Sequence, residues 1–309
     1  MGHVKRCLAI SEKLKTLISC NINYFMKDSE IGQKTVNKYG YGTIDKIFDK
    51  KRDVIITSLP QLTNELMLEL KNHTNLLVCL DDSRRKQFFA DIVIRGSIVP
   101  KLRECDPVCD SKFLLGKDYM VLDKQFQEYH ELNRVIYPEV KSILIAMGGS
   151  DINNFTMTVM DAMERLDIPD VKKIVVVGPA FNDVNRLIKR KGFQFEYDVS
   201  NMAELMFEAD IIIAGGGMIL YELACVGTPG IVLCQTDYQM MEAKCFGKEG
   251  VIINLGDEIY FSKELIAFQT NSLMDNYGKR KRMSNFGKVL INGRAIDKIV
   301  NVIKMELKH

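Results

Sequence analysis

The chain has 309 residues, 47% of them apolar and 27% charged, and its 42 basic and 40 acidic side chains leave a net charge of +2. This length suits two domains of about 150 residues each, and the composition is that of a folded protein rather than a disordered one. The balanced charge argues against a dedicated nucleic-acid binder, and the lack of any run of about 18 apolar residues argues against a membrane span.

The N-terminal part of the chain begins with a helical pattern, which apolar residues form at Val4, Cys7, Leu8 and Leu14. Three apolar runs follow it. They are rich in Val and Ile and continuous rather than alternating, which is typical of parallel strands buried on both faces. These predicted strands are residues 53–59, 75–80 and 90–96.

A polar segment, residues 123–141, lacks a strand pattern and is predicted to connect two domains. Beyond it, apolar runs of the same kind alternate with helical patterns at residues 153–166 and 201–209, and a last helical segment covers residues 284–308. The predicted strands of this part are residues 142–149, 173–179, 210–217, 230–234 and 250–256.

The alternation of strands and helices predicts an α/β protein with parallel sheets and right-handed crossovers. We expect two Rossmann-like, doubly wound domains that face a cleft. The N-terminal domain is expected over residues 1–128, and the C-terminal domain over residues 129–309, including the last helix. Ligands of such folds bind beyond the carboxyl ends of the strands, so a site is expected in the loops that leave those ends.

The eight cysteines lie mostly within apolar runs, where a free thiol behaves as a small hydrophobic side chain. Cys105 and Cys109 form a C-x3-C pair, but no second pair with the spacing of a zinc site accompanies them. We therefore expect reduced thiols in a cytoplasmic protein, without a disulfide framework, a bound metal or a cofactor.

Two glycine-rich loops follow predicted strands of the second domain: GGSD at residues 148–151 and GGGM at residues 215–218. A glycine-rich turn before a helix exposes backbone N–H groups at the positive end of the helix dipole, where phosphate binds. The alternative is that these glycines only make tight strand-to-helix turns. Two such loops in one domain favour a diphosphate ligand.

Two side chains are candidates to act beside such a ligand. Glu222 lies in the first turns of the helix after GGGM. A carboxylate there can accept hydrogen bonds from ribose hydroxyls or simply pair with the helix N-terminus, and its spacing favours neither. His3 is a candidate general base near neutral pH, although a histidine at position three usually belongs to a loose terminus.

Seven segments together carry a family resemblance, in order over nearly the whole chain. They are residues 2–10, 75–83, 90–94, 113–122, 143–151, 199–233 and 237–243. Through them the chain resembles the nucleotide-sugar hydrolases of pseudaminic acid biosynthesis and the related spore-coat polysaccharide proteins. It is also similar to the N-acetylglucosaminyltransferase that makes the lipid-linked peptidoglycan precursor. The fold that this resemblance implies is GT-B.

The resemblance implies a metal-independent reaction in which a UDP-linked diacetamido-trideoxy-hexose and water give the free sugar and UDP, with inversion at the anomeric carbon. In the family the histidine of the N-terminal G-H-x-x-R stretch is catalytic, and His3 matches it. Neutral His3 would then position and deprotonate the water. The resemblance also implies the substrate-binding residues. Gly149, Ser150, Gly216 and Gly217 would face the diphosphate, Glu222 the ribose, Val199 and Met202 the uracil, and Gln239 the sugar or phosphate. Gly2 and Met218 would bind the substrate as well.

The chain departs from the family pattern at three places. It begins at the Gly-His loop, where the first domain of the family opens with a strand, so we expect the natural protein to begin about one strand and turn further upstream. Residues 58–63 stand where an aromatic-bearing loop near the sugar is expected. Arg95 stands where a small polar residue is usual.

Two other functions stay open. A GT-B glycosyltransferase would need an acceptor site, often an apolar patch on the first domain, and a non-catalytic protein would only bind the nucleotide sugar. We expect a UDP-sugar as the ligand in each case. We also expect a monomer with no partner among nucleic acids or membranes.

Overall fold

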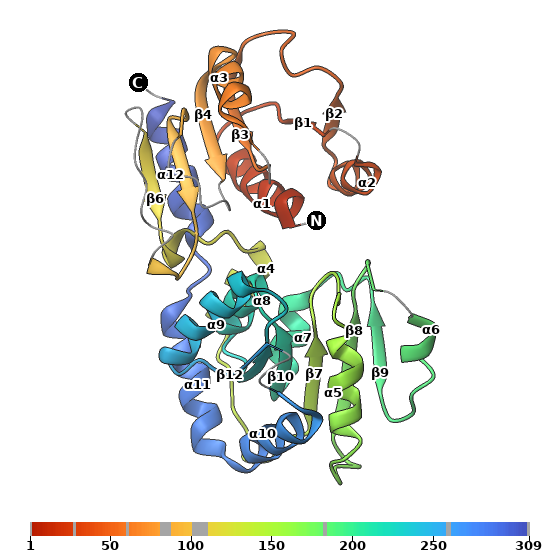
Figure 1. Cartoon of the computed structure of the whole chain (residues 1–309). Coiled ribbons are helices and arrows are strands. Elements are labelled where there is room, and N and C mark those ends of the chain that lie inside the picture. Colours follow the sequence, from red (N-terminus) through yellow and green to blue (C-terminus); the bar gives the residue numbers. More distant parts are fainter. Residues whose placement is uncertain are drawn as a thin grey trace. The chain divides into compact units, whose positions relative to one another are not determined.

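The structure, a computed structural model, divides the chain into two compact units. The first consists of Met1–Asp123 and Gly293–His309, and the second of Lys124–Asn292. Each unit is an α/β structure built on a parallel sheet (Figure 1). The residues that the structure describes are 2–26, 29–59, 62–80, 88–100, 111–181, 184–257 and 261–307.

The second unit holds a six-stranded sheet in which all neighbouring strands are parallel. Its order is β12–β11–β10–β7–β8–β9. The chain therefore adds β8 and β9 on one side of β7 and then β10, β11 and β12 on the other. The strands are β7 (Ser142–Ala146), β8 (Lys172–Val177), β9 (Gln194–Tyr197), β10 (Ile211–Gly215), β11 (Gly230–Leu233) and β12 (Ile252–Gly256). The helices are α4 (Lys124–Glu131), α5 (Phe155–Met163), α6 (Val184–Leu187), α7 (Met202–Glu208), α8 (Met218–Val226), α9 (Asp237–Lys248), α10 (Lys263–Asp275) and α11 (Tyr277–Leu290).

The central strands of this sheet are buried on both faces. Ile211 and Ile213 of β10 pack with α5 and α10 in one core cluster. Ile212 points to the opposite face, where it lies near Leu223 of α8; a Cβ added to Gly230 would be 3.3 Å from both side chains. This double burial explains why the strands read as continuous apolar runs in the sequence.

The first unit holds a four-stranded parallel sheet in the order β3–β4–β5–β6, and a separate parallel pair, β1–β2. On one face, Leu76 and Val78 of β4 pack with α1 and α12, and on the other Leu77 and Cys79 pack with α3. The strands are β1 (Asn23–Phe25), β2 (Gly42–Ile44), β3 (Arg52–Thr57), β4 (Thr74–Leu80), β5 (Ile92–Arg95) and β6 (Lys112–Leu115). The helices are α1 (Gly2–Leu17), α2 (Glu30–Lys38), α3 (Asn64–Asn72), the 3-10 helix η2 (Lys117–Tyr119) and α12 (Ala295–Glu306).

All eight predicted strands are present, as β3, β4, β5, β7, β8, β10, β11 and β12. Four further strands, β1, β2, β6 and β9, are only three or four residues long and carry no run of Val and Ile, and both ends of β9 are exposed. The connecting segment 123–141 has no strand, as predicted, and contains α4. Among the helices of the described ranges, none combines the length and apolar character needed to cross a membrane.

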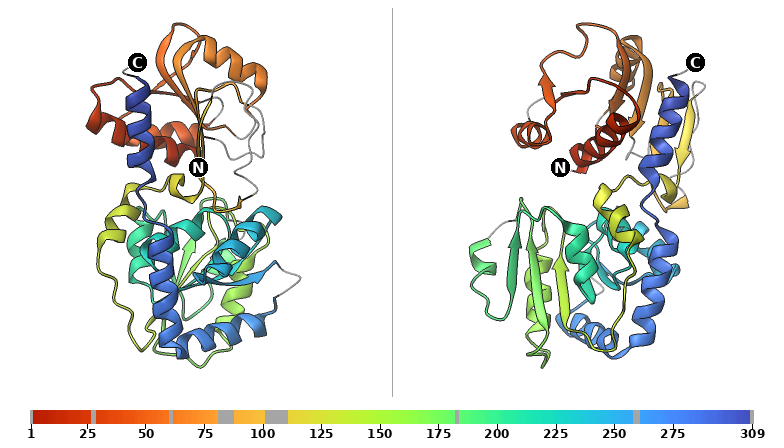
Figure 2. Two further views of the ribbon diagram at one scale, coloured as in Figure 1. Left: turned by 90° about the vertical axis from the view of Figure 1, so that its left-hand side faces the viewer. Right: turned by 180° about the vertical axis from the view of Figure 1, so that it is seen from behind.

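The C-terminal segment corrects the prediction of a single last helix in the second domain. Helix α11 ends at Leu290, and α12 starts after Gly293, which has a left-handed φ of 71°. Helix α12 packs against α1 and belongs to the first unit (Figure 2). The side chains that make this contact line one face of α12 and belong to the same core cluster as residues of α1 and β4. They are Ile296, Ile299, Val300 and Ile303.

The cysteines in the described ranges are free thiols. Burial raises the pKa of Cys225 and of Cys234 to about 12, so both thiols stay protonated at neutral pH. The C-x3-C pair, Cys105 and Cys109, lies outside the described residues.

Arg280 joins separate segments of the second unit. Its side chain is fully buried on α11. The guanidinium donates hydrogen bonds to the carbonyl oxygens of Leu273 and Met274 at the end of α10, and of Tyr137 and Pro138 in the connecting segment. Burial lowers the pKa of this group, and the four carbonyl oxygens compensate for its lost hydration.

We expect Arg280→Met to lower the free energy of unfolding by about 2–4 kcal/mol, because methionine fills the space but leaves buried carbonyl oxygens without donors. Lys281→Met, at the exposed neighbouring position, should change it by less than about 0.5 kcal/mol. Chemical denaturation followed by circular dichroism measures both. Equal stability of the two variants would contradict this role of Arg280.

Candidate functional site

The strand order of the second unit creates a switch point between β7 and β10. From β7 the chain continues to β8 and β9 on one side, and from β10 it continues to β11 and β12 on the other. Ligands of open α/β sheets bind in the crevice at such a position. The loops 148–151 and 215–218 leave these two neighbouring strands, so the structure brings both predicted glycine loops to the switch point.

Helix α8 begins directly at the GGGM loop. Gly217 is its N-cap residue and has a φ of 92°, a left-handed conformation that favours glycine. Among the described residues no side chain caps this helix, and its first turn holds no acidic residue. Its first backbone N–H groups therefore form a partly positive end without a side-chain acceptor, beginning at half-buried Met218.

Gln239 of α9 places a side-chain donor beside this helix end. Its Oε1 accepts a hydrogen bond from the N–H of Gln235 at 2.7 Å, so its Nε2 is left as the donor. Nε2 lies 3.9 Å from the position of a Cβ added to Gly217. Because α9 follows β11, the strand next to β10, the sheet topology is what brings Gln239 to the loop.

Gly216 allows this close approach. A Cβ added there would lie 2.5 Å from Cβ of Gln239 and 3.0 Å from its Cγ, so any side chain at this position would displace the glutamine or the loop. The GGGM loop therefore agrees with both interpretations of its glycines, the tight turn and the phosphate-binding helix end. Its glycines make a tight, packed turn, and they leave N–H groups at the end of a helix.

The GGSD loop does not supply a second open helix end, which corrects the expectation of two. The buried carboxylate of Asp151 accepts hydrogen bonds from the backbone N–H groups of Phe155 at 2.8 Å and Thr156 at 2.7 Å. The chain's own acid thus caps α5. Gly149 and Ser150 are exposed at the switch point, and their contact with a diphosphate stays a prediction.

The residues predicted to bind the nucleoside lie close to α8 in the fold. Glu222 is half-buried one turn after Met218, and its charge adds to the effect of burial on the pKa of Cys225. Val199 and Met202 are half-buried in the segment after β9, where α7 begins and packs against α8. The roles of these residues at ribose and uracil stay predictions.

His3 lies in the first unit and is not part of a loose terminus. It occupies the first turn of α1, after exposed Gly2, and is half-buried. Its Nδ1 is 2.9 Å from Oγ of Ser58, which directly follows β3, and 3.0 Å from an Nη of Arg6. His3 therefore lies at the carboxyl edge of the four-stranded sheet. Ser58 could not be found from the sequence, since only the fold brings β3 to α1.

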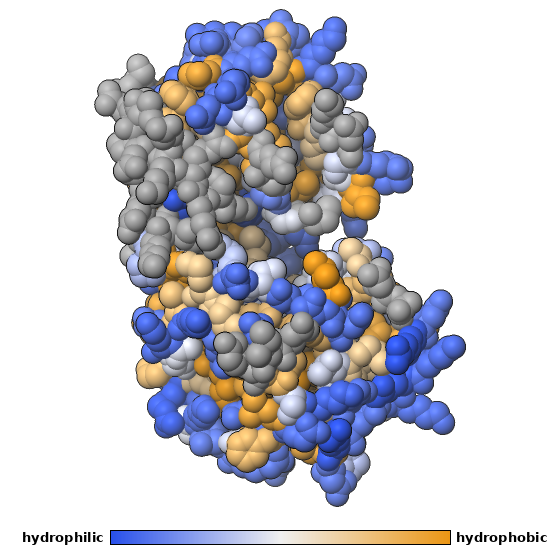
Figure 3. All heavy atoms as spheres, in the orientation of Figure 1, coloured by the Kyte–Doolittle hydropathy of each residue, from blue (hydrophilic) through white to orange (hydrophobic). Residues whose placement is uncertain are grey.

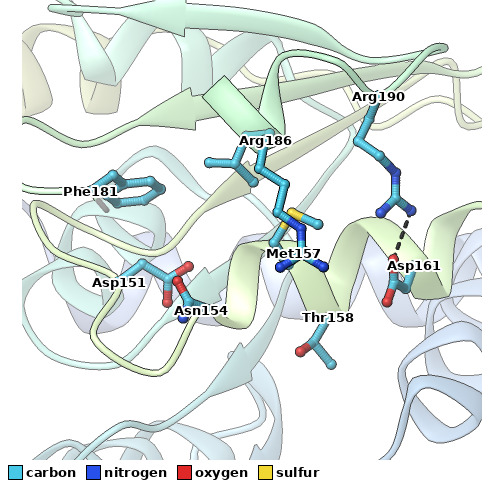
Figure 4. Close-up of a pocket in the computed structure, with 9 residues that line it drawn as sticks. Asp151, Asn154, Met157, Thr158, Asp161, Phe181, Arg186 and Arg190 are labelled. Atoms are coloured by element: carbon cyan, nitrogen blue, oxygen red, sulfur yellow. Dashed lines mark hydrogen bonds and ion pairs between the residues drawn. The ribbon is translucent and has the colours of Figure 1, made fainter. Parts of the chain in front are cut away.

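A separate cavity of about 170 Å³ lies beside α5 and α6 (Figure 4). At one end, Asp161 is paired with Arg190 at 2.7 Å and with Lys263, and hydrogen bonds from Lys263 and from Arg190 lower the pKa of this carboxyl group. The surface over α5 and α6 is largely hydrophilic (Figure 3). None of the residues that line the cavity is a predicted site residue. They are Asp151, Asn154, Met157, Thr158, Asp161, Phe181, Arg186, Leu187 and Arg190.

The two Rossmann-like domains define the class of fold, which is GT-B. Acinetobacter baumannii MurG has the same fold, with a TM-score of 0.68 and 13% sequence identity over 98% of this chain and 96% of that one. HepE of Anabaena, solved in complex with UDP-glucose, has a TM-score of 0.62 and 10% identity over 98% and 96% of the two chains. At these identities the likeness concerns the fold alone.

A particular relative is similar in sequence along both units. The spore coat polysaccharide biosynthesis protein SpsG of Bacillus subtilis is 27% identical over 322 residues, which cover 98% of this chain and 94% of SpsG. No family model matches the chain. The similarity to SpsG therefore rests on the alignment of nearly complete chains rather than on one motif.

We expect Gly216→Ala and Gly217→Ala each to weaken UDP binding at least about tenfold, or ~1.4 kcal/mol, by displacing Gln239 or straining the loop. Gly247→Ala is the matched control. It lies in α9, where an added Cβ would make an ordinary 3.7 Å contact. Isothermal titration calorimetry with UDP measures all three. Wild-type affinity in both loop variants would place the ligand elsewhere.

We expect Asp161→Asn to lower the free energy of unfolding at pH 7 by about 0.5–1 kcal/mol, since the ion pairs are partly exposed. The folded state holds the pKa of Asp161 below its ordinary value of 3.8, so the contribution is complete above that value and is lost as the pH falls through the folded-state pKa. Urea unfolding should show the difference shrinking in acid. Asp167→Asn, at an exposed position, is the control, and a pH-independent loss would contradict the assignment.

Proposed function

We propose that the chain is an enzyme of surface-polysaccharide or pseudaminic-type acid biosynthesis that hydrolyses a UDP-linked diacetamido-trideoxy-hexose to the free sugar and UDP. One observation carries the proposal: the uncapped N-terminus of α8 lies at the switch point, with the amide of Gln239 beside it. Fixed N–H donors at a helix end suit a diphosphate, and they can stabilise it without a cation.

In this proposal the second unit holds the nucleotide. The main-chain donors after Gly216 and Gly217 and the side chain of Gln239 bind the diphosphate, together with Gly149 and Ser150 of the neighbouring loop. Glu222 accepts hydrogen bonds from the ribose hydroxyls, and Val199 and Met202 contact the uracil. Their half-buried positions around α8 and α7 support this division of the substrate.

The reaction forms a bond between the oxygen of water and the anomeric carbon, with inversion. The bond from that carbon to the diphosphate oxygen breaks, its electron pair leaves with UDP, and one proton of the water is released. Negative charge grows on the leaving oxygen, so donors that are already fixed at α8 stabilise the transition state more than the ground state. In this proposal His3, the match to the family's catalytic histidine, positions the water and takes up this proton.

The comparisons support a function that involves nucleotide sugars and polysaccharide biosynthesis. SpsG is named for spore coat polysaccharide biosynthesis, and its similarity covers both units. HepE, which has the same fold, was solved with UDP-glucose. We place the protein in the cytoplasm as a monomer, where its free thiols would stay reduced.

Incubation of the purified protein with a panel of UDP-sugars, without an acceptor, tests the proposal. We expect rapid release of UDP from substrates with acetamido groups at C2 and C4, unchanged by EDTA. Release that requires an added acceptor would instead identify a glycosyltransferase. Tight UDP-sugar binding without release under either condition would identify a binding protein.

We expect His3→Ala to lower kcat for hydrolysis by about 10²–10⁴-fold, because a positioned catalytic side chain contributes that much. UDP affinity should stay within about threefold, since the nucleotide binds to the other unit, and a threefold change is only ~0.65 kcal/mol. Stopped assays of UDP release and calorimetry separate the two effects. Unchanged turnover would remove His3 from the mechanism.

A further inference from the structure

The first unit contains two separate parallel sheets, β1–β2 and β3–β4–β5–β6, and both are packed against α1 (Figure 1). The hydroxyl of Tyr24 in β1 donates a hydrogen bond to Oγ of Ser11 in α1 at 2.7 Å. Ile22, directly before β1, packs in one core cluster with residues of α1 and with Val54 and Ile56 of β3. Among the described residues, β1 pairs only with β2 and β3 only with β4, so each has one edge without a ladder partner there.

Strands β1 and β3 run in the same direction. Ser58, directly after β3, has its Oγ 2.9 Å from Nδ1 of His3 in the first turn of α1. Met26, directly after β1, packs in one cluster with Val4 and Leu8, which belong to the N-terminal half of α1. The carboxyl ends of both strands therefore lie at the same end of α1, so one further strand could pair with both of them in a parallel ladder.

The faces on which the helices lie give the place of this further strand. Helix α3 leads from β3 to β4 and packs with Leu77 and Cys79 on one face of the sheet. Helix α1 packs with Leu76 and Val78 on the opposite face and leads to β1. In one parallel sheet with right-handed crossovers, helices on opposite faces carry the chain in opposite directions. Because α3 carries it from β3 towards β6, a strand that leads into α1 belongs between β3 and β1.

The second unit has the same arrangement with this position filled. Its order β11–β10–β7–β8–β9 corresponds to β4 and β3 on one side of the position and β1 and β2 on the other. Strand β7 leads into α5, which lies on the opposite face of its sheet from α8, as α1 does from α3. Residues 143–145 of β7 are fully buried. By contrast, Val54 and Ile56 of β3 and Tyr24 of β1 are only half-buried.

We propose that the first unit has an open position for one parallel strand between β1 and β3, and that its occupant is a short segment rich in Val and Ile that leads into α1. A strand there would lie about 4.8 Å from each neighbour and would supply backbone partners to both edges. Helices cover both faces of the adjacent β3, where Ile55 packs with α3 and Ile56 with α1, so the occupant must be apolar throughout. The inference stands on the sheet topology and not on the proposed reaction.

The open position also determines where His3 lies in the completed sheet. In the second unit, the loop that follows β7 is GGSD at the switch point. The turn between the proposed strand and α1 is the counterpart of that loop, and Gly2 and His3 begin the helix directly after it. Both residues would then belong to the strand-to-helix junction at the switch point of the first unit, the place where open α/β sheets bind ligands.

Hydrogen–deuterium exchange followed by mass spectrometry tests whether the position is open in the unmodified chain. We expect the fastest amides of β1 and β3 to exchange at least about tenfold faster than those of β4 and β5, which have a partner on each side. Equal protection of β1, β3 and β4 would show that the position is already filled, and would overturn the inference.

A strand added to the chain tests the occupant. A copy of residues 142–149, which form β7 and the turn after it, is joined in front of Met1. We expect exchange in β1 and β3 to slow at least about tenfold and Tm to rise by at least about 4 °C, because an edge on each strand gains a ladder and apolar surface is buried. Exchange in β9, an edge strand of the other unit, should stay within about twofold.

The matched control is the same extension with aspartate at its copies of Ile143 and Ile145, since unpaired carboxylates cannot enter an apolar sheet. Slowed exchange with the apolar extension alone supports the proposal. No slowing, or equal slowing with both extensions, would overturn it when circular dichroism shows folded protein. A copy of residues 173–178 from β8 replaces the first extension if that one is insoluble, and the same criteria hold. No step uses a nucleotide sugar, so the result is independent of whether the proposed hydrolysis is found.

Discussion

The pairing of β10 with β7 is the constraint on which the candidate site depends. Ala214 of β10 is in register with Ala146 of β7, so the two glycine loops start side by side although a long stretch of chain separates them. The chain then turns to opposite sides of the sheet after the two strands. Because helices cover both faces, the carboxyl edge at this junction is where backbone N–H groups can meet a ligand. Helix α8, Gln239 and the half-buried residues around them are positioned by that one adjacency.

The two helices that leave the switch point satisfy their N-termini in different ways. Helix α5 is capped by Asp151, which is worth about 0.5–2 kcal/mol to a helix and blocks an external anion at the two N–H groups it binds. Helix α8 starts at a glycine with no side-chain cap among the described residues, and so gives up that stabilisation. A helix end that is left open while its neighbour is capped suits an anion supplied from outside the chain.

Burial explains which elements could be predicted from the sequence. The strands with continuous Val and Ile runs were predicted because both of their faces are covered, whereas β1, β2, β6 and β9 are short and partly exposed and carry no such run. The helical pattern of the last segment was also recognised, but an apolar stripe does not state its partner. Ile296 and Ile299 therefore gave no sign that α12 would leave the second unit and pack against α1.

By itself the sequence determined the α/β class, the order of the main strands and the position of the glycine loops, because these depend on local periodicity and on backbone conformations that only glycine adopts freely. It also singled out Gly216, Gly217, Glu222 and His3 as candidates. Tertiary structure alone decided that Asp151 occupies the end of α5, that Gln239 packs on Gly216, and that Ser58 and Arg6 converge on Nδ1 of His3. Each of these contacts depends on which strands are neighbours or on the direction of a side chain, and neither is encoded in the spacing of residues along the chain.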